Sequence, residues 1–292
     1  MKFRIVKTIG VAFAAMFVFG LGGTAVRAEE AKVLNVYNWA DYLPDGLLEN
    51  FTKETGIKVR YDTFDTNEIV HAKLIAGRTG YDIIVPSANW AALHIQAGLF
   101  QKLDKSKLTN LKNTDPVMMK LLSQADPGNQ YLVNWAWGFV TLGINTGKVK
   151  AALGSDPMPE NAWSLIFDPK YAKKLKSCGI SMLDSATDVI PAALHYLGKP
   201  AYSTNPADYT EATKLMRAIR PNIKIFSSGI NDLAGGGLCM ALGYSGDMNI
   251  AAKRAKEGKT GQTIEALVPS TGGLLFYDNM AIPADAEHPN NA

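Results

Sequence analysis

The chain has 292 residues, of which 47% are apolar, and a formal net charge of +3. This apolar fraction is sufficient for packed cores, and the length exceeds that of a typical single domain, so we expect two folded units. The positive charge does not indicate nucleic acid or an anionic membrane surface as a partner, because residues 1–28 contain four cations and no acid. Without that segment the net charge is −1.

Residues 1–28 are typical of a cleavable secretory signal peptide. A positively charged start is followed by an uncharged run from 9 to 23, and Val26-Arg27-Ala28 offers a signal peptidase small residues to recognise. A membrane anchor is the alternative, but the apolar run is shorter than the roughly 18 residues that a span requires. We therefore expect a mature protein that is free in solution outside the cytoplasm.

The two cysteines, Cys178 and Cys239, form an even pair in a chain expected in an oxidising compartment. Such a pair predicts an intramolecular disulfide, and two free buried thiols are the alternative. Two isolated cysteines do not have the spacing of a metal site.

Strand and helix patterns alternate in the first part of the chain. The expected strands are 33–37, 57–61 and 81–85, and the expected helices are 47–54, 68–76 and 89–97. This alternation predicts an α/β unit with a mainly parallel sheet. Because ligands bind beyond the carboxyl ends of the strands in such sheets, the loops 38–42 and 86–88 are binding candidates.

The second part of the chain repeats the α/β pattern after a strand at 134–145, which we expect to cross from one unit to the other. The expected strands that follow are 179–183, 238–244 and 274–282, and the main expected helices are 187–197, 208–219 and 249–256. We assign 29–138 and 257–292 to a first lobe and 139–256 to a second lobe. A chain that crosses twice between lobes favours a hinged clamshell around a central cleft.

The sequence contains no recognisable catalytic or metal-binding pattern. None of its four histidines has a second histidine or a cysteine at ligand spacing, and there is no nucleophile elbow, zinc-protease motif or phosphate loop. We therefore expect a binding protein without a metal or cofactor. A secreted enzyme is the alternative from another class, but no nucleophile and base can be placed together.

Acidic and aromatic residues recur where the expected strands end. They are Trp39, Asp41 and Tyr42, then Asp184 and Asp188, then Tyr244 and Asp247, and finally Phe276, Tyr277 and Asp278. Any one of them alone is more often a helix cap or a solvated side chain. Together they describe a site for a short alkyl chain with ammonium groups, because carboxylates bind amines through charge-assisted hydrogen bonds and aromatic faces attract cations.

Six segments occur in a specific order along the chain. They are YNWADY at 37–42, FTKETGIKV at 51–59, GYDIIVPS at 80–87, INDLA at 230–234, GYSGD at 243–247 and FYD at 276–278. In this combination the chain resembles the periplasmic polyamine-binding proteins of ABC importers, most closely the putrescine-binding branch. The resemblance implies a type II clamshell that holds putrescine in the interlobe cleft, acts as a monomer and delivers its ligand to an inner-membrane permease.

The resemblance also implies roles for individual residues. Trp39, Tyr42, Tyr244 and Phe276 are expected to form an aromatic box around the methylenes. Asp41, Ser87, Asp188, Asp247 and Asp278 are expected to bind the amines. Tyr244 stands where close relatives have Trp, and Ala40 stands where the putrescine branch has Ser. Phe276 is typical of the putrescine branch, and spermidine, cadaverine or another cationic solute is the alternative ligand.

The last expectation concerns the C-terminus. The family that this chain resembles continues well past 283–286, with helices that complete the second lobe and supply a further aromatic residue. This chain stops at Ala292. We therefore expect a fragment or a shortened gene, with a second lobe that lacks its C-terminal part.

Overall fold

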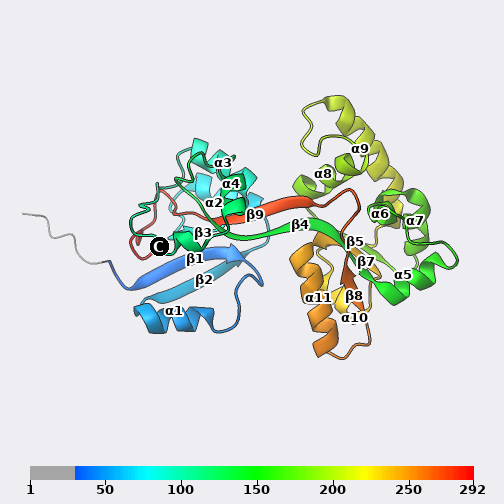
Figure 1. Cartoon of the computed structure of the whole chain (residues 1–292), viewed down its shortest axis with the longest axis horizontal. Coiled ribbons are helices and arrows are strands. Elements are labelled where there is room, and N and C mark those ends of the chain that lie inside the picture. The colour runs from blue at the N-terminus through cyan, green and yellow to red at the C-terminus, as the bar shows by residue number, and fades with distance from the viewer. Residues whose placement is uncertain (1–29) are drawn as a thin grey trace, which may run out of the picture.

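The computed structural model describes residues 30–292 as two α/β halves joined by two long strands (Figure 1). The expected signal peptide, 1–28, lies outside the described residues. Among residues 30–292, none of the helices has the length and apolar character that a bilayer crossing demands. The predicted α/β, two-lobed architecture is present in this structure.

The first lobe is built on a three-stranded parallel sheet of order β2-β1-β3. Its strands are β1 (Val33–Trp39), β2 (Lys58–Phe64) and β3 (Ile83–Ile84), and its helices are α1 (Leu47–Thr55), α2 (Asn67–Ala76), α3 (Ala88–Gln96) and α4 (Pro116–Leu122), with a short 3-10 turn, η1, at Leu111–Asn113. Strand β3 is shorter than the expected 81–85, because only Ile83 and Ile84 pair with β1. Thr66 precedes α2 as its N-cap, and its hydroxyl accepts from the backbone N–H of Ile69.

The second lobe is built on a larger sheet of order β6-β5-β7-β4-β8. Its strands are β4 (Val133–Asn145), β5 (Ile180–Met182), β6 (Ile225–Phe226), β7 (Met240–Tyr244) and β8 (Ile264–Ala266). Its helices are α5 (Thr146–Leu153), α6 (Ser164–Phe167), α7 (Pro169–Leu175), α8 (Ala186–Tyr196), α9 (Pro206–Ile219), α10 (Ile230–Gly235) and α11 (Ser245–Glu257), with a 3-10 turn, η2, at Arg220–Asn222. Its main core surrounds the fully buried Trp163 and Phe167.

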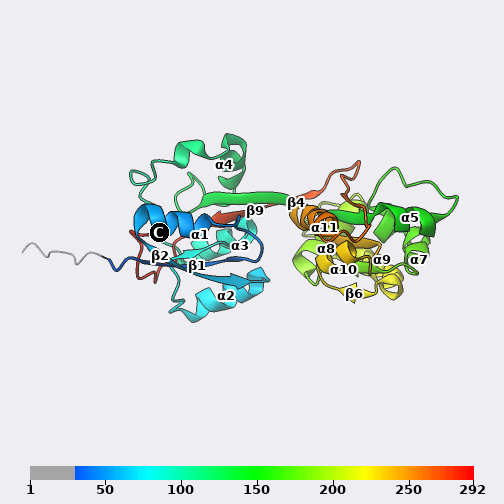
Figure 2. The same ribbon diagram turned by 90° about the horizontal axis from the view of Figure 1, so that it is seen from below.

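Two antiparallel strands connect the lobes. The C-terminal half of β4 pairs with β7 and β8 in the second sheet, and its N-terminal half pairs with β9 (Leu274–Met280). Figure 2 shows β4 and β9 side by side as they pass between the lobes. The pair therefore occupies the position of a hinge.

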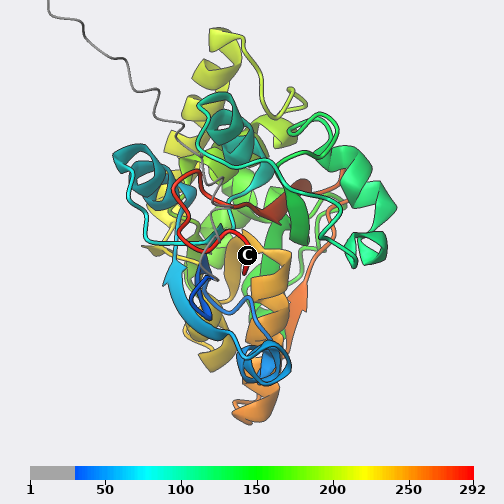
Figure 3. The ribbon, with the colours of Figure 1, turned by 90° about the vertical axis from the view of Figure 1, so that its left-hand side faces the viewer.

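The chain returns to the first lobe later than we expected. Residues 257–292 were assigned to the first lobe, but β8 pairs with β4 and Ile264 packs with α10 and α11 in the second lobe. The return occurs along β9. Beyond it, Ala281 and Pro283 form isolated bridges to Ile84 and Phe100, so the C-terminus lies against the first lobe (Figure 3).

The expected disulfide between Cys178 and Cys239 is present. Cys178 follows α7 and Cys239 immediately precedes β7, so the bond joins the end of a helix to the start of a central strand. It lies in the core of the second lobe, with Cys239 fully buried.

Candidate ligand-binding cleft

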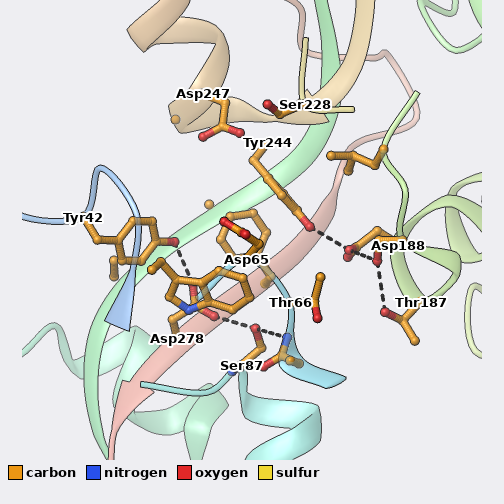
Figure 4. Close-up of a pocket in the computed structure, with 18 of the residues that line it drawn as sticks. Tyr42, Asp65, Thr66, Ser87, Thr187, Asp188, Ser228, Tyr244, Asp247 and Asp278 are labelled. Carbon is orange, nitrogen blue, oxygen red and sulfur yellow. Dashed lines mark hydrogen bonds between the residues drawn. The ribbon is translucent and has the colours of Figure 1, made fainter. Parts of the chain in front are cut away.

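A cleft of about 1260 Å³ lies between the two lobes. Its walls come from the loops after β1 and β3 in the first lobe and from the N-terminal ends of α8 and α11 in the second lobe, and the hinge strands β4 and β9 lie behind it (Figure 4). This is the edge of the sheets at which the sequence predicted a ligand.

All the residues that the sequence assigned to the site line this one cleft. They are Trp39, Asp41, Tyr42, Ser87, Asp188, Tyr244, Asp247, Phe276 and Asp278. Ala40, Asp184 and Tyr277, which we also singled out, line the same cleft. The structure brings together residues from both lobes, and their roles in binding remain predictions.

Asp278 is the centre of a hydrogen-bonded cluster on the first-lobe side. Its two carboxylate oxygens accept from the hydroxyls of Tyr42 and Ser87, each at 2.6 Å. The amide of Asn67 donates to the Ser87 hydroxyl at 3.0 Å and accepts from the Ser87 backbone N–H at 3.0 Å. Burial raises the pKa of Asp278 to about 6, although the hydrogen bonds from Ser87 and Tyr42 act in the opposite direction.

Ser87 and Asp278 meet because of their backbone positions. The two residues form an isolated antiparallel bridge between the loop after β3 and strand β9. Ser87 precedes α3 at the N-cap position, but its side chain makes no capping bond to that helix. Its hydroxyl is therefore available to Asp278, which the sequence pattern of a helix cap would not indicate.

Asp188 has a matching position on the second-lobe side. One of its oxygens accepts from the hydroxyl of Tyr244 at 2.8 Å and from that of Ser185 at 2.6 Å. The Ser185 and Thr187 hydroxyls lie 3.2 Å apart. The Tyr244 ring meets the Phe276 ring edge-on at 5.2 Å between centroids, so the aromatic and acidic groups form one continuous wall.

Trp39 and Tyr42 form the aromatic wall of the first lobe. Their ring centroids are 6.4 Å apart, and Trp39 also packs on Phe64 at 4.5 Å. The indole N–H of Trp39 donates to the carbonyl of Val85 at 2.9 Å, which holds the ring in place. Its face can therefore cover the alkyl part of a ligand without a change of rotamer.

An ion pair between the two lobes lies in the lining of the cleft. The guanidinium of Arg254, on α11, lies 3.0 Å from the carboxylate of Asp41, in the loop after β1. Burial and, to a smaller extent, the charge of Asp41 raise the pKa of the nearby Asp247 to about 6, whereas Arg254 acts to lower it. Asp41 has a positive φ of 56°, a conformation that Asp tolerates better than most residues.

The charge on the cleft walls is predominantly negative. The lining carboxylates are Asp41, Asp65, Glu68, Asp184, Asp188, Asp232, Asp247 and Asp278, and Arg254 is the one basic side chain among the lining residues. No group of three or more side chains in residues 30–292 is arranged to hold a metal ion. Its acidic lining makes the cleft suited to a cation.

Sequence reasoning missed Asn67, Ser185 and Thr187. Each stands at or next to the start of a helix, where polar residues are ordinarily caps. They line the cleft, where Asn67 bonds to Ser87, Ser185 bonds to Asp188 and Thr187 contacts Ser185.

Two α/β lobes joined by a strand pair around a cleft are the architecture of a periplasmic solute-binding protein. The chain belongs to the bacterial extracellular solute-binding proteins, whose family model matches residues 46–292. This confirms the expected family and class: the protein is periplasmic and is not an enzyme.

Individual relatives have names that specify a solute. The chain is 46% identical over 290 residues to a putrescine-binding periplasmic protein of Pseudomonas aeruginosa, with 99% of this chain and 79% of that protein covered. It is 47% identical over 268 residues to a putrescine-binding periplasmic protein of Escherichia coli, with 91% and 72% covered. A spermidine/putrescine transporter substrate-binding protein of Streptococcus pneumoniae has a similar structure, with a TM-score of 0.68 and 28% identity over 89% of this chain and 75% of that one.

Proposed function

We propose that this protein captures putrescine in the periplasm and delivers it to an inner-membrane ABC permease. The observation that carries the proposal is the position of two hydrogen-bonded carboxylates, Asp188 and Asp278, in a cleft whose lining includes a single basic residue. One carboxylate belongs to each side of the cleft, and aromatic rings lie between them (Figure 4). A diamine requires this combination, because each ammonium needs an anionic partner and the methylenes need an apolar cover.

We assign the individual roles as the sequence suggested. Trp39, Tyr42, Tyr244 and Phe276 cover the methylenes. Asp41, Ser87, Asp188, Asp247 and Asp278 hold the amines. Asp41 is paired with Arg254, so it can hold an amine only if that ion pair opens or is shared.

Isothermal titration with putrescine, cadaverine and spermidine tests the proposal. We expect the tightest binding with putrescine. Spermidine is the second candidate, because a cleft of about 1260 Å³ also has room for a longer chain. Absence of heat with all three amines would exclude polyamine binding, and tighter binding of spermidine would replace the proposed ligand.

The same proposal includes closure of the two lobes on the ligand and an interaction with the permease. The first lobe, on β2-β1-β3, and the second, on β6-β5-β7-β4-β8, close on the ligand by bending along β4 and β9. A monomer in the closed state then meets the permease. Small-angle scattering should show a smaller radius of gyration with putrescine, and light scattering should give the mass of one chain.

A further inference from the structure

On the first-lobe side of the cleft, the hydroxyl protons already form hydrogen bonds within the protein. A hydroxyl has one proton to donate and two lone pairs that accept. Tyr42 and Ser87 each donate that proton to Asp278, and the amide of Asn67 donates into a lone pair of Ser87. Neither hydroxyl therefore has a proton left for a ligand.

The second-lobe side repeats the arrangement with different residues. Tyr244 and Ser185 each donate to the same oxygen of Asp188. Because the proton of Ser185 is committed to the carboxylate, the contact between Ser185 and Thr187 uses the proton of Thr187. Each side thus consists of an aspartate that accepts from one tyrosine and one serine, and the serine in turn accepts from a further donor.

Both sides consequently present lone pairs to the ligand. Ionised carboxylates have no proton, and the free oxygen of Asp188 receives no hydrogen bond from residues 30–292. The indole N–H of Trp39 is likewise committed, to the carbonyl of Val85. Thr66 and Ser228 also line the cleft, but they lie outside the two clusters, because neither makes a hydrogen bond to Asp188 or Asp278.

We propose that the two tyrosine–serine–aspartate clusters determine specificity by offering hydrogen-bond acceptors only, so that the cleft selects a ligand with a donor-only group at each end and rejects an amino alcohol of equal length. The proposal rests on the proposed binding of putrescine. It assigns Tyr244 and Ser185 a role in selection: they direct their protons into Asp188 and away from the ligand.

The contrast between an ammonium and a hydroxyl explains the selection. An ammonium brings three donors and no acceptor, so an acceptor-only wall can satisfy it completely. A hydroxyl in the same place uses its one donor and leaves its lone pairs buried without a partner. A buried polar group without a partner lowers affinity by about 5- to 150-fold, in addition to the loss of the charge.

The first measurement compares putrescine with 4-amino-1-butanol, at about pH 7.5 so that the carboxylates are ionised. We expect the amino alcohol to bind at least about 100-fold more weakly than putrescine. Failure of putrescine itself to bind would refute the proposed function. Binding of putrescine together with amino-alcohol binding within about threefold would instead overturn the present inference and leave the proposed function standing.

A double-mutant cycle separates proton direction from simple charge. In Asp188→Leu the hydroxyl of Tyr244 loses its acceptor, so it can donate to the oxygen of the amino alcohol. Adding Tyr244→Phe should then weaken amino-alcohol binding by about 2- to 12-fold, the range of one hydrogen bond. In the parent, where that proton is already committed to Asp188, Tyr244→Phe should have a smaller effect on the amino alcohol.

An equal effect of Tyr244→Phe in both backgrounds would show that only charge matters and would overturn the inference. If Asp188→Leu does not fold, as judged by its thermal melt, Asp188→Asn takes its place. In that variant the new amide supplies a donor directly. The ratio of putrescine to amino-alcohol affinity should then fall to about 10 or below, and a ratio that stays at the parent value would count against the inference.

Discussion

Tyr42 and Asp278 are 236 positions apart in the chain, and their side chains are joined by a hydrogen bond of 2.6 Å. Tyr42 lies in the loop after β1, and Asp278 lies on β9, one of the two strands that connect the lobes. Burial and the neighbouring Asp278 hold the pKa of Tyr42 well above its usual range, so its hydroxyl keeps its proton at neutral pH and donates it to Asp278. The loop after β1, which we propose to bind the ligand, is thus held against a strand that connects the lobes.

The carboxylate of Asp278 should be essential for binding a diamine. Asp278→Asn removes the anionic partner of one ammonium in a buried setting, and such losses typically weaken binding by about 2–5 kcal/mol. We expect a loss of about 30-fold or more in putrescine affinity by calorimetry. Asp45→Asn, an exposed site outside the cleft lining, is the control. Parent-like binding by Asp278→Asn would remove this residue from the site.

The Tyr42 hydroxyl should contribute less than the carboxylate that it supports. Tyr42→Phe keeps the ring and removes one hydrogen bond, which is worth about 0.5–1.5 kcal/mol, or more where the partner is charged. We expect a loss of roughly 2- to 12-fold in putrescine affinity. A loss as large as that in Asp278→Asn would mean that the tyrosine contacts the ligand directly.

Binding should weaken as the pH falls through about 6. The pKa values of Asp247 and Asp278 are both raised to about 6 in the ligand-free protein, mainly by burial. Below that pH the free carboxyls hold protons that a dication must displace, while the amines stay charged because their pKa is near 10. We expect constant affinity above about pH 7 and a steep fall below it.

Calorimetry in buffers with different ionisation enthalpies provides a second measure of the same effect. Near pH 6 the binding of putrescine should release protons, and the release should disappear well above that pH. Unchanged affinity down to about pH 4 would show that these carboxylates do not hold the ligand.

Asp247 should lower the stability of the ligand-free protein at neutral pH. Its pKa is raised from 3.8 in the unfolded chain to about 6 when folded, so the folded state binds more protons between these values. Stability therefore falls as the pH rises through this window, and the full loss, of the order of 1–3 kcal/mol, is present above pH 6.

Asp247→Asn should consequently melt at a higher temperature than the parent at pH 7 and show a weaker dependence on pH. Asp247 lies in the first turn of α11, where a negative charge is favourable by about 0.3–1 kcal/mol, so the net gain should be about 1–2 kcal/mol. The same variant should bind putrescine more weakly. A lower melting temperature than the parent at pH 7 would contradict the sign of this argument.

Removal of the disulfide should affect stability and leave the site intact. The bond between Cys178 and Cys239 has a sequence separation of 61 residues, for which loop entropy corresponds to about 4 kcal/mol. The double replacement by Ser should lower the melting temperature and leave putrescine affinity within about twofold, because neither residue lines the cleft. A large loss of affinity in folded protein would show that the cleft depends on this bond.

The fold could be predicted because its signals are local. Apolar runs such as 33–37 and helix ends such as Gly56 are visible within a few residues, and most of the site residues stand at or shortly after the end of a strand. Phe276 and Asp278 are exceptions, because they lie within β9 and not at its end. The boundary at 257 could not be read in this way, because the pairing of β8 with β4 is a contact between distant segments.

The hydrogen-bond partners within the site were equally inaccessible to sequence reasoning. Asp41 was expected to bind an amine, but its contact with Arg254 joins residues 213 positions apart. The Ser87 hydroxyl resembles a helix cap in the sequence and instead donates to Asp278. A polar residue has several possible partners, and only the tertiary structure selects among them.

Strand β9 imposes a constraint on how this protein can evolve. Phe276 and Asp278 line the cleft from alternate positions of a strand whose register with β4 extends from Leu274 to Met280. Insertion or deletion of one residue in this segment would turn at least one of the two side chains to the opposite face. Replacement of single residues in β9 can therefore change the ligand preference. Changes of length should be tolerated only outside β9. We expect natural variants to keep the spacing of this segment constant.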